Sequence, residues 1–134
     1  MIINHDLIEE HKLPGLSHRT VAGPLQGFHS LEVWVQTVDP GAATPVHRHD
    51  CEEAIVILEG QGVLALDGGE QAFGPGETLL IPRNAVHQVT CDGPEPLRLI
   101  AALGAAPVHV HSATNERIPL PWDVEPSGDV DKVG

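Results

Sequence analysis

The chain has 134 residues, of which 41% are hydrophobic and 19% are charged, and this composition predicts one globular domain with a single core. Nineteen acidic residues against seven basic ones give a formal charge of −12, which excludes nucleic acid as a favourable partner and disfavours anionic membrane surfaces. No segment approaches the about 20 apolar residues of a membrane span, and no basic, apolar leader begins the chain. We therefore expect a cytoplasmic protein without a membrane partner, in which Cys51 and Cys91 are reduced thiols.

Short strand-like runs bounded by Gly or Pro follow one another along the chain. In 31–36 apolar residues alternate with Glu, Trp and Gln, the period of two that is typical of a strand. Further runs lie at 53–60, 62–69, 77–82, 87–91 and 96–103. Both parities of 53–58 are largely apolar, so we expect this strand to be covered on both faces. The spacing predicts an all-β sandwich or barrel, with 1–124 as a single domain and 125–134 as an acidic C-terminal tail.

The most polar cluster of the chain lies directly before its most strand-like run. His47 and His49 are two residues apart, so a strand directs both imidazoles to one point while Arg48 faces away. The return strand is expected to bring Glu53 alongside, and His87, at the start of another strand, is the best candidate for a fourth donor. Three neutral imidazoles and one carboxylate suit a divalent ion, and Zn, Fe, Mn, Ni and Co all remain open.

The spacing of these residues resembles the two motifs of the cupins. The pattern G-x5-H-x-H-x3-E-x6-G, which starts at Gly41, matches the first cupin motif at every fixed position. The pattern G-x5-P-x-N-x2-H, which starts at Gly76, is similar to the second, with Asn84 in place of glycine and Cys91 in place of a terminal asparagine. Asparagine tolerates a positive φ, so Asn84 is compatible with the motif. The resemblance implies a cupin-type double-stranded β-helix, a jelly-roll barrel with the metal inside.

A longer resemblance, over about 13–124, is to the plant auxin-binding protein family. The segments LPGLSHRTVAG, LEVWVQTVDPGAATPVHRHDCEEAIVILEGQG, VHQV and IPLPWDVE are similar to segments of that family in the same order. The resemblance implies a zinc ion, held by the four residues above and completed by the carboxylate of an indole acid. It also implies a ligand pocket of Leu13, Leu16, Gln36, Thr44, Pro45, Ile55 and Trp122. Ile55 stands where the family has an aromatic residue, and Trp122 either closes the pocket over a ring or pins the C-terminal segment to the barrel.

Two classes of function fit these residues. The first is a binding protein that holds a small, aromatic, monoanionic carboxylate on its metal, because a divalent ion with one ligating carboxylate keeps one net positive charge. The second is a metal-dependent enzyme, a dioxygenase, isomerase or decarboxylase, in which Glu53 leaves the metal and acts as a base. The chain has no tyrosine, and no second acid lies near the motif, so we favour binding. The cupin resemblance also implies a homodimer that pairs through an edge strand.

Several other polar residues have a simpler interpretation. His109 and His111 form a second His-x-His, but no carboxylate or third histidine lies at a matching spacing, so an exposed strand face is expected rather than a metal site. Cys51 is interpreted as a small residue in a tight turn rather than an extra ligand. Arg83 could guide an anion, although a solvated position is favoured, and Glu52 is the alternative ligand if the turn is one residue shorter.

Overall fold

The structure, a computed structural model, describes residues 1–124, so the predicted acidic tail at 125–134 lies outside it. Within this range the chain is almost entirely β, with two single-turn 3-10 helices near the N-terminus. In chain order the elements are η1 (His5–Leu7), β1 (His11–Leu13), β2 (Leu16–Ala22), η2 (Pro24–Gln26), β3 (Glu32–Val38), β4 (Glu53–Glu59), β5 (Gly62–Leu66), β6 (Gly69–Phe73), β7 (Thr78–Ile81), β8 (His87–Cys91) and β9 (Leu97–Leu103). None of the helices described here is long and apolar enough to cross a membrane.

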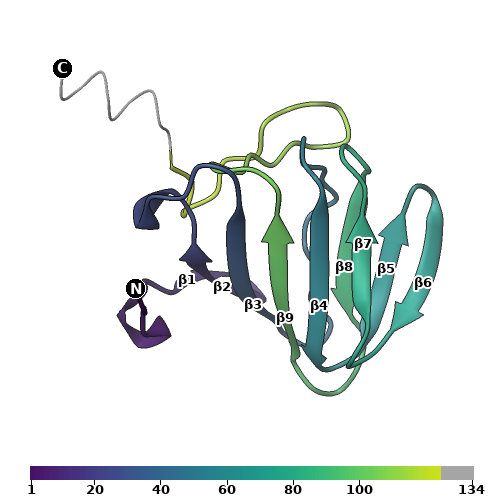
Figure 1. Cartoon of the computed structure of the whole chain (residues 1–134). Coiled ribbons are helices and arrows are strands. Elements are labelled where there is room, and N and C mark those ends of the chain that lie inside the picture. Colours follow the sequence, from purple (N-terminus) through teal and green to yellow (C-terminus); the bar gives the residue numbers. More distant parts are fainter. Residues whose placement is uncertain (125–134) are drawn as a thin grey trace.

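The strands form two antiparallel sheets (Figure 1). One has six strands in the order β1-β2-β3-β9-β4-β7, and the other has three in the order β6-β5-β8. Isolated bridges from Ala43 to Thr90 and from His47 to His87 continue the pairing of β8 into the chain that precedes β4. The core between the sheets contains Val38, Leu97, Ile57 and Leu99 among its most deeply buried side chains. The predicted all-β jelly-roll fold is confirmed.

All six predicted strands are present, as β3, β4, β5, β7, β8 and β9, and β1, β2 and β6 were not predicted. In β2 the most deeply buried residue is His18, so its inward face does not look apolar in the sequence. In β6 only Phe73 is buried, because this strand lies at the edge of its sheet. A local signal for β6 exists in the turn before it, where Asp67 and Gly68 have φ values of 49° and 81°, as the Asp-Gly turns of β-hairpins require.

The two cupin-like motifs place residues of positive φ where the chain turns. Gly60, the last glycine of the first motif, has a φ of 84°, and a Cβ there would lie 2.6 Å from the carbonyl oxygen of Pro96 and 2.8 Å from Cα of Leu97. Only glycine fits that position without a shift of the neighbouring backbone. Asn84 has a φ of 65°, so asparagine adopts the left-handed conformation expected where the motif has glycine.

The inward face of β3 is the more polar of its two faces. Glu32, Trp34, Gln36 and Val38 are buried, while the apolar residues between them are only partly covered. This parity is stable because the buried polar groups are hydrogen-bonded: Nε1 of Trp34 donates to Glu32 at 2.8 Å, and Gln36 contacts Nδ1 of His18 at 2.9 Å. The face of β3 that carries more apolar residues is therefore not the face that is buried.

Strand β4 is covered on one face, and the expectation of two-sided burial was wrong. Ile55 and Ile57 are 3% and 1% exposed, whereas Val56 and Leu58 are 38% and 44% exposed. The six-stranded sheet has no described layer packed on its outer side, so the second apolar parity of β4 remains at the surface. Glu53, the first residue of β4, shares the inward parity with Ile55 and is therefore directed into the barrel.

Candidate metal centre and ligand pocket

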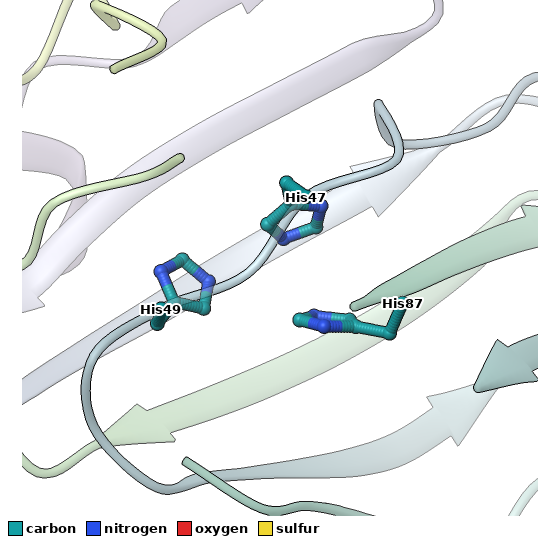
Figure 2. A group of neighbouring side chains, drawn as sticks. All are labelled: His47, His49 and His87. Atoms are coloured by element: carbon teal, nitrogen blue, oxygen red, sulfur yellow. The ribbon is translucent and has the colours of Figure 1, made fainter. Parts of the chain in front are cut away.

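Backbone pairing brings the two cupin-like motifs together. The amide of His47 donates to the carbonyl of His87 at 3.0 Å, and the amide of His87 donates back to the carbonyl of His47 at 2.8 Å. This pair sets the two imidazoles on neighbouring segments, and His49 follows two residues later on the same face (Figure 2). Arg48, between them, faces outward, where its guanidinium donates to Asn84 and Asn115. The predicted alternation of 47–49 is thus present, although this segment belongs to no regular strand.

The tautomer of each histidine follows from its hydrogen bond. In all three rings Nδ1 lies within hydrogen-bond distance of a backbone carbonyl oxygen, which can only accept, so Nδ1 carries the proton and Nε2 keeps a free lone pair. An imidazole fixed in this way is oriented to bind a metal through Nε2. The three pairs are His47 with Pro45 at 2.6 Å, His87 with Ala85 at 2.9 Å and His49 with His109 at 3.0 Å.

The inward atoms of these residues converge. One ligand atom from each of His47, His49 and His87 lies within 4.8 Å of the others, and Oε1 of Glu53 lies 3.2 Å from Nε2 of His87 and 3.6 Å from Nε2 of His49. Nε2 of His49, Nε2 of His87 and Oε1 of Glu53 are buried and have no hydrogen-bond partner among the described residues. Such atoms are costly to bury alone, and one cation would satisfy them together. We call these four residues the His–Glu cluster, and its donors fit a divalent metal ion.

The charge states within the cluster favour metal binding. Burial, with repulsion from the neighbouring histidines, lowers the pKa of His47 to about 4. Burial also lowers the pKa of His49 below its ordinary value. Burial alone would raise the pKa of Glu53, but the contact with His87 and the interactions with the other imidazoles outweigh it, so this pKa lies below its usual value. Neutral imidazoles and an ionised carboxylate are the forms that a metal ion requires.

A pocket of about 610 Å³, including its solvent-facing mouth, adjoins the His–Glu cluster, whose four residues form part of its wall. Every one of the seven predicted ligand-binding residues lines the pocket, and their contact with a ligand remains a prediction. Five further lining residues were missed, and Trp34 could have been found because it shares the parity of Gln36 in β3. The missed residues are Trp34, Val89, Leu99, Val110 and Leu120.

Both tryptophans of the chain lie in the wall of this pocket. Their ring centroids are 6.0 Å apart at an interplanar angle of 72°. Trp122 also stacks on His18, with centroids 3.6 Å apart and an angle of 8°, and Trp34 lies edge-to-face against His49 at 5.9 Å. Trp122 therefore lies in the pocket wall and also packs against His18 of β2, and its closure of the pocket over a ring stays a prediction.

His18 is the buried histidine that sequence reasoning did not identify. It is 1% exposed, and burial lowers its pKa to about 3, so it is neutral. Its Nδ1 lies 2.9 Å from the amide nitrogen of Gln36 and accepts from it, while Nε2 donates to the hydroxyl of Thr20 at 2.7 Å. We call His18, Thr20, Glu32, Trp34 and Gln36 the β2–β3 network.

The remaining candidates have structural positions. His109 and His111 lie outside the regular strands and are half-buried, so the expected exposed strand face was wrong. Glu52 is exposed while its neighbour in sequence enters the cluster, so it does not serve as the alternative ligand. Arg83 is exposed and donates to the carbonyl of Asp50 at 2.8 Å. Cys51 is buried, which raises the pKa of its thiol to about 11.

The antiparallel barrel with this cluster inside it is that of a cupin, and solved cupin structures superimpose on it. The polyketide cyclase RemF from Streptomyces resistomycificus matches with a TM-score of 0.70 at 23% identity, over 92% of this chain and 88% of that protein. A sugar phosphate isomerase from a cupin superfamily of Silicibacter pomeroyi matches with a TM-score of 0.71 at 19% identity, over 95% and 98% of the two chains. These likenesses establish the fold.

Within the cupins, the chain belongs to the auxin-binding protein family. The sequence profile of that family matches residues 5–125. An auxin-binding protein of Nicotiana tabacum is 41% identical over 138 residues, which cover 87% of this chain and 74% of the relative. The family resemblance seen in the sequence is confirmed.

Proposed function

We propose that this protein is a metal-binding cupin that holds a small aromatic monocarboxylate, of the kind represented by indole acids, inside its barrel. His47, His49, Glu53 and His87 would bind one divalent ion, with zinc as the preferred metal. The ion would supply the positive charge against which a buried carboxylate is neutralised. The names of the relatives, which describe auxin binding, support this class of ligand.

The observation that carries the proposal is the contrast between the His–Glu cluster and the rest of the pocket wall. The cluster directs unpartnered polar atoms inward, while most of the other lining residues are apolar. A ligand that enters must therefore be apolar over most of its surface and anionic at one end. The indoles of Trp34 and Trp122, which lie edge-to-face, offer aromatic surface to a flat ring. Gln36, whose amide is oriented by His18, offers a second N–H that can donate to a carboxylate.

In the enzyme alternative Glu53 would leave the metal and act as the base, and a general acid would have to come from a residue outside the His–Glu cluster. Among the described residues that line the pocket, the His–Glu cluster supplies every ionisable side chain. Binding without turnover is therefore the better-supported function. Turnover of a carboxylate by iron-loaded protein under oxygen would overturn that preference.

The direct test is metal analysis of protein purified without added metal, followed by calorimetric titration of indole-3-acetic acid and of benzoate. We expect near-stoichiometric zinc, and binding of the indole acid to the zinc-loaded protein but not to chelator-treated protein. The variant Glu59→Gln serves as a control, because it removes an exposed carboxylate that lies outside the pocket and should bind zinc and the acid as the wild type does. Equal binding of the acid with and without zinc would contradict a carboxylate held by the metal.

We also propose a homodimer, which the cupin resemblance implied would pair through an edge strand such as β7. Support comes from the outer side of the six-stranded sheet, where Val56, Leu58 and Leu80 are 38%, 44% and 72% exposed. These exposed apolar side chains, on a chain of charge −12, provide a surface at which two copies can approach with less repulsion than elsewhere. Light scattering after size exclusion should give twice the chain mass, and Leu80→Glu should give the monomer mass. A monomer at every concentration tested would refute the dimer.

A further inference from the structure

Glu32 is a buried carboxylate that lies outside the His–Glu cluster but uses both of its oxygens. It is 5% exposed and begins β3 on the inward face. Oε1 accepts a hydrogen bond from Nε1 of Trp34 at 2.8 Å, and Oε2 accepts one from the backbone amide of Val108 at 2.7 Å. Both donors are N–H groups that cannot accept, so the arrangement requires an acceptor at each oxygen. A carboxylate meets that requirement, and a neutral amide side chain does not.

Both hydrogen-bond donors of Glu32 lie next to groups that contact His49. Val108 directly precedes His109, whose carbonyl accepts the Nδ1 proton of His49 at 3.0 Å. Trp34, held by the other oxygen, lies edge-to-face against the ring of His49 at a centroid distance of 5.9 Å and an angle of 75°. Glu32 therefore fixes both the carbonyl that sets the tautomer of His49 and the indole that limits its rotation.

His49 needs such support more than the other two histidines of the cluster. His47 and His87 donate to carbonyls two residues before them, so their orientation is set by the local chain. The acceptor of His49 lies 60 residues away in sequence, on a segment that belongs to no regular strand. Two backbone hydrogen bonds between Arg48 and His111 hold this segment on one side of His109, and Glu32 holds it on the other side at Val108. Release of Val108 would leave the His49 proton freer to occupy either ring nitrogen, and a proton on Nε2 blocks metal binding.

We propose that Glu32 is a positioning residue for the metal site, which holds the Trp34 indole and the 108–109 backbone together so that His49 presents an unprotonated Nε2. The inference rests on the proposed metal-binding function, but its structural part can be tested in metal-free protein. The competing explanation is that Glu32 only anchors the chain after β9. That explanation predicts a general loss of stability with no particular effect on His49.

The variant Glu32→Gln is nearly isosteric and can accept from one of the two donors but not from both. Zinc affinity, measured by competition with a chromophoric chelator, is expected to fall about 10–100-fold, as for other residues that orient metal ligands. Long-range nitrogen–proton NMR spectra of the metal-free variant should show a mixture of tautomers at His49, with the Nδ1–H form retained at His47 and His87. Glu59→Gln should change neither measurement, since that exposed carboxylate pairs with Arg98 at the surface.

An unchanged His49 spectrum in Glu32→Gln, or equal changes at all three histidines, would overturn the positioning role. If wild-type protein does not bind zinc, the proposed function fails, and the tautomer measurement still decides the role of Glu32. If the variant does not fold, hydrogen exchange on the wild type gives the answer. Zinc should raise the protection of the Val108 amide from exchange more than that of amides in β5 and β6. The reason is that, if the hydrogen bond from Val108 to Glu32 favours zinc binding, bound zinc must stabilise that hydrogen bond to the same extent. No preferential change at Val108 would refute the proposal.

Discussion

Two groups of buried polar side chains lie side by side in this barrel and differ in how their hydrogen bonds are used. In the β2–β3 network His18 is hydrogen-bonded at both ring nitrogens by other members, and Glu32 accepts at both oxygens, from Trp34 and from the backbone amide of Val108. In the His–Glu cluster Nδ1 of each imidazole donates to a backbone carbonyl, but the inward atoms of His49, His87 and Glu53 have no hydrogen-bond partner among the described residues. The histidine and carboxylate of the first group have all their partners within the fold, whereas the second group needs a cation to satisfy its inward atoms. Burial alone does not separate the two groups, and hydrogen-bond satisfaction does.

The largest expected effect comes from removing the metal. A site that binds zinc in the folded state alone stabilises that state by about 4 kcal/mol when free zinc is 1,000 times its dissociation constant. We expect chelation to lower the unfolding temperature and the free energy of unfolding accordingly, measured by urea denaturation with buffered zinc and with chelator. In His87→Leu the two curves should coincide. Equal stability of the wild type in zinc and in chelator would show that the unpartnered atoms of the cluster mark no metal site.

Apolar replacement should affect the two groups differently in metal-free protein. His18→Leu strands the amide of Gln36 and the hydroxyl of Thr20, which is expected to cost about 1–3 kcal/mol of stability. His87→Leu leaves the carbonyl of Ala85 without its donor but also removes an unpartnered buried nitrogen, so the loss of metal-free stability should be smaller than for His18→Leu. Denaturation of both variants in chelator measures the difference. A larger loss for His87→Leu than for His18→Leu would reverse the comparison.

Acid should destabilise the metal-free protein through histidines of both groups. The pKa values of His18 and His47 fall from 6.5 to about 3 and about 4, so between pH 6.5 and 4 the unfolded chain binds more protons than the folded one. Stability is therefore full above pH 6.5 and decreases as the pH falls, by about 1 kcal/mol per histidine at pH 5.5. Denaturation curves at pH 7 and 5.5 test this. His18→Leu should lose less stability over that interval, and an unchanged pH dependence would mean that His18 is not held neutral.

The smallest expected effect is on ligand affinity at the aromatic wall. Trp122→Ala removes one of the two indoles and should weaken binding of indole-3-acetic acid by about 1 kcal/mol, the usual contribution of an aromatic pair. Zinc affinity should be unchanged, because Trp122 contacts no member of the His–Glu cluster through a hydrogen bond described here. Titration calorimetry provides both values, with Phe28→Ala, at an exposed aromatic residue, as the control. Unaltered affinity for the acid would assign Trp122 to holding the C-terminal segment alone.

The parts of the fold that could be predicted depend on short-range patterns. Alternation within β3, the Gly- and Pro-bounded runs of β4 and β9, and the positive φ at Asn84 are properties of a few neighbouring residues. The same holds for His47 and His49, whose common direction follows from the period of a strand. The burial of both faces of β4 was predicted wrongly, and the polar inward face of β3 was not predicted, because both depend on whether another layer or a hydrogen-bond partner is present. No local pattern records that.

The sequence by itself determined the strand series, the residue types of the His–Glu cluster and the resemblance to auxin-binding proteins, because spacing along one chain fixes these. Only the tertiary structure decided that Glu32 is buried between Trp34 and Val108, and that His49 is oriented by a carbonyl 60 residues further along. The physical reason is that a buried polar group is tolerated only where its partners converge. That convergence is a property of packing between distant segments, not of any one of them.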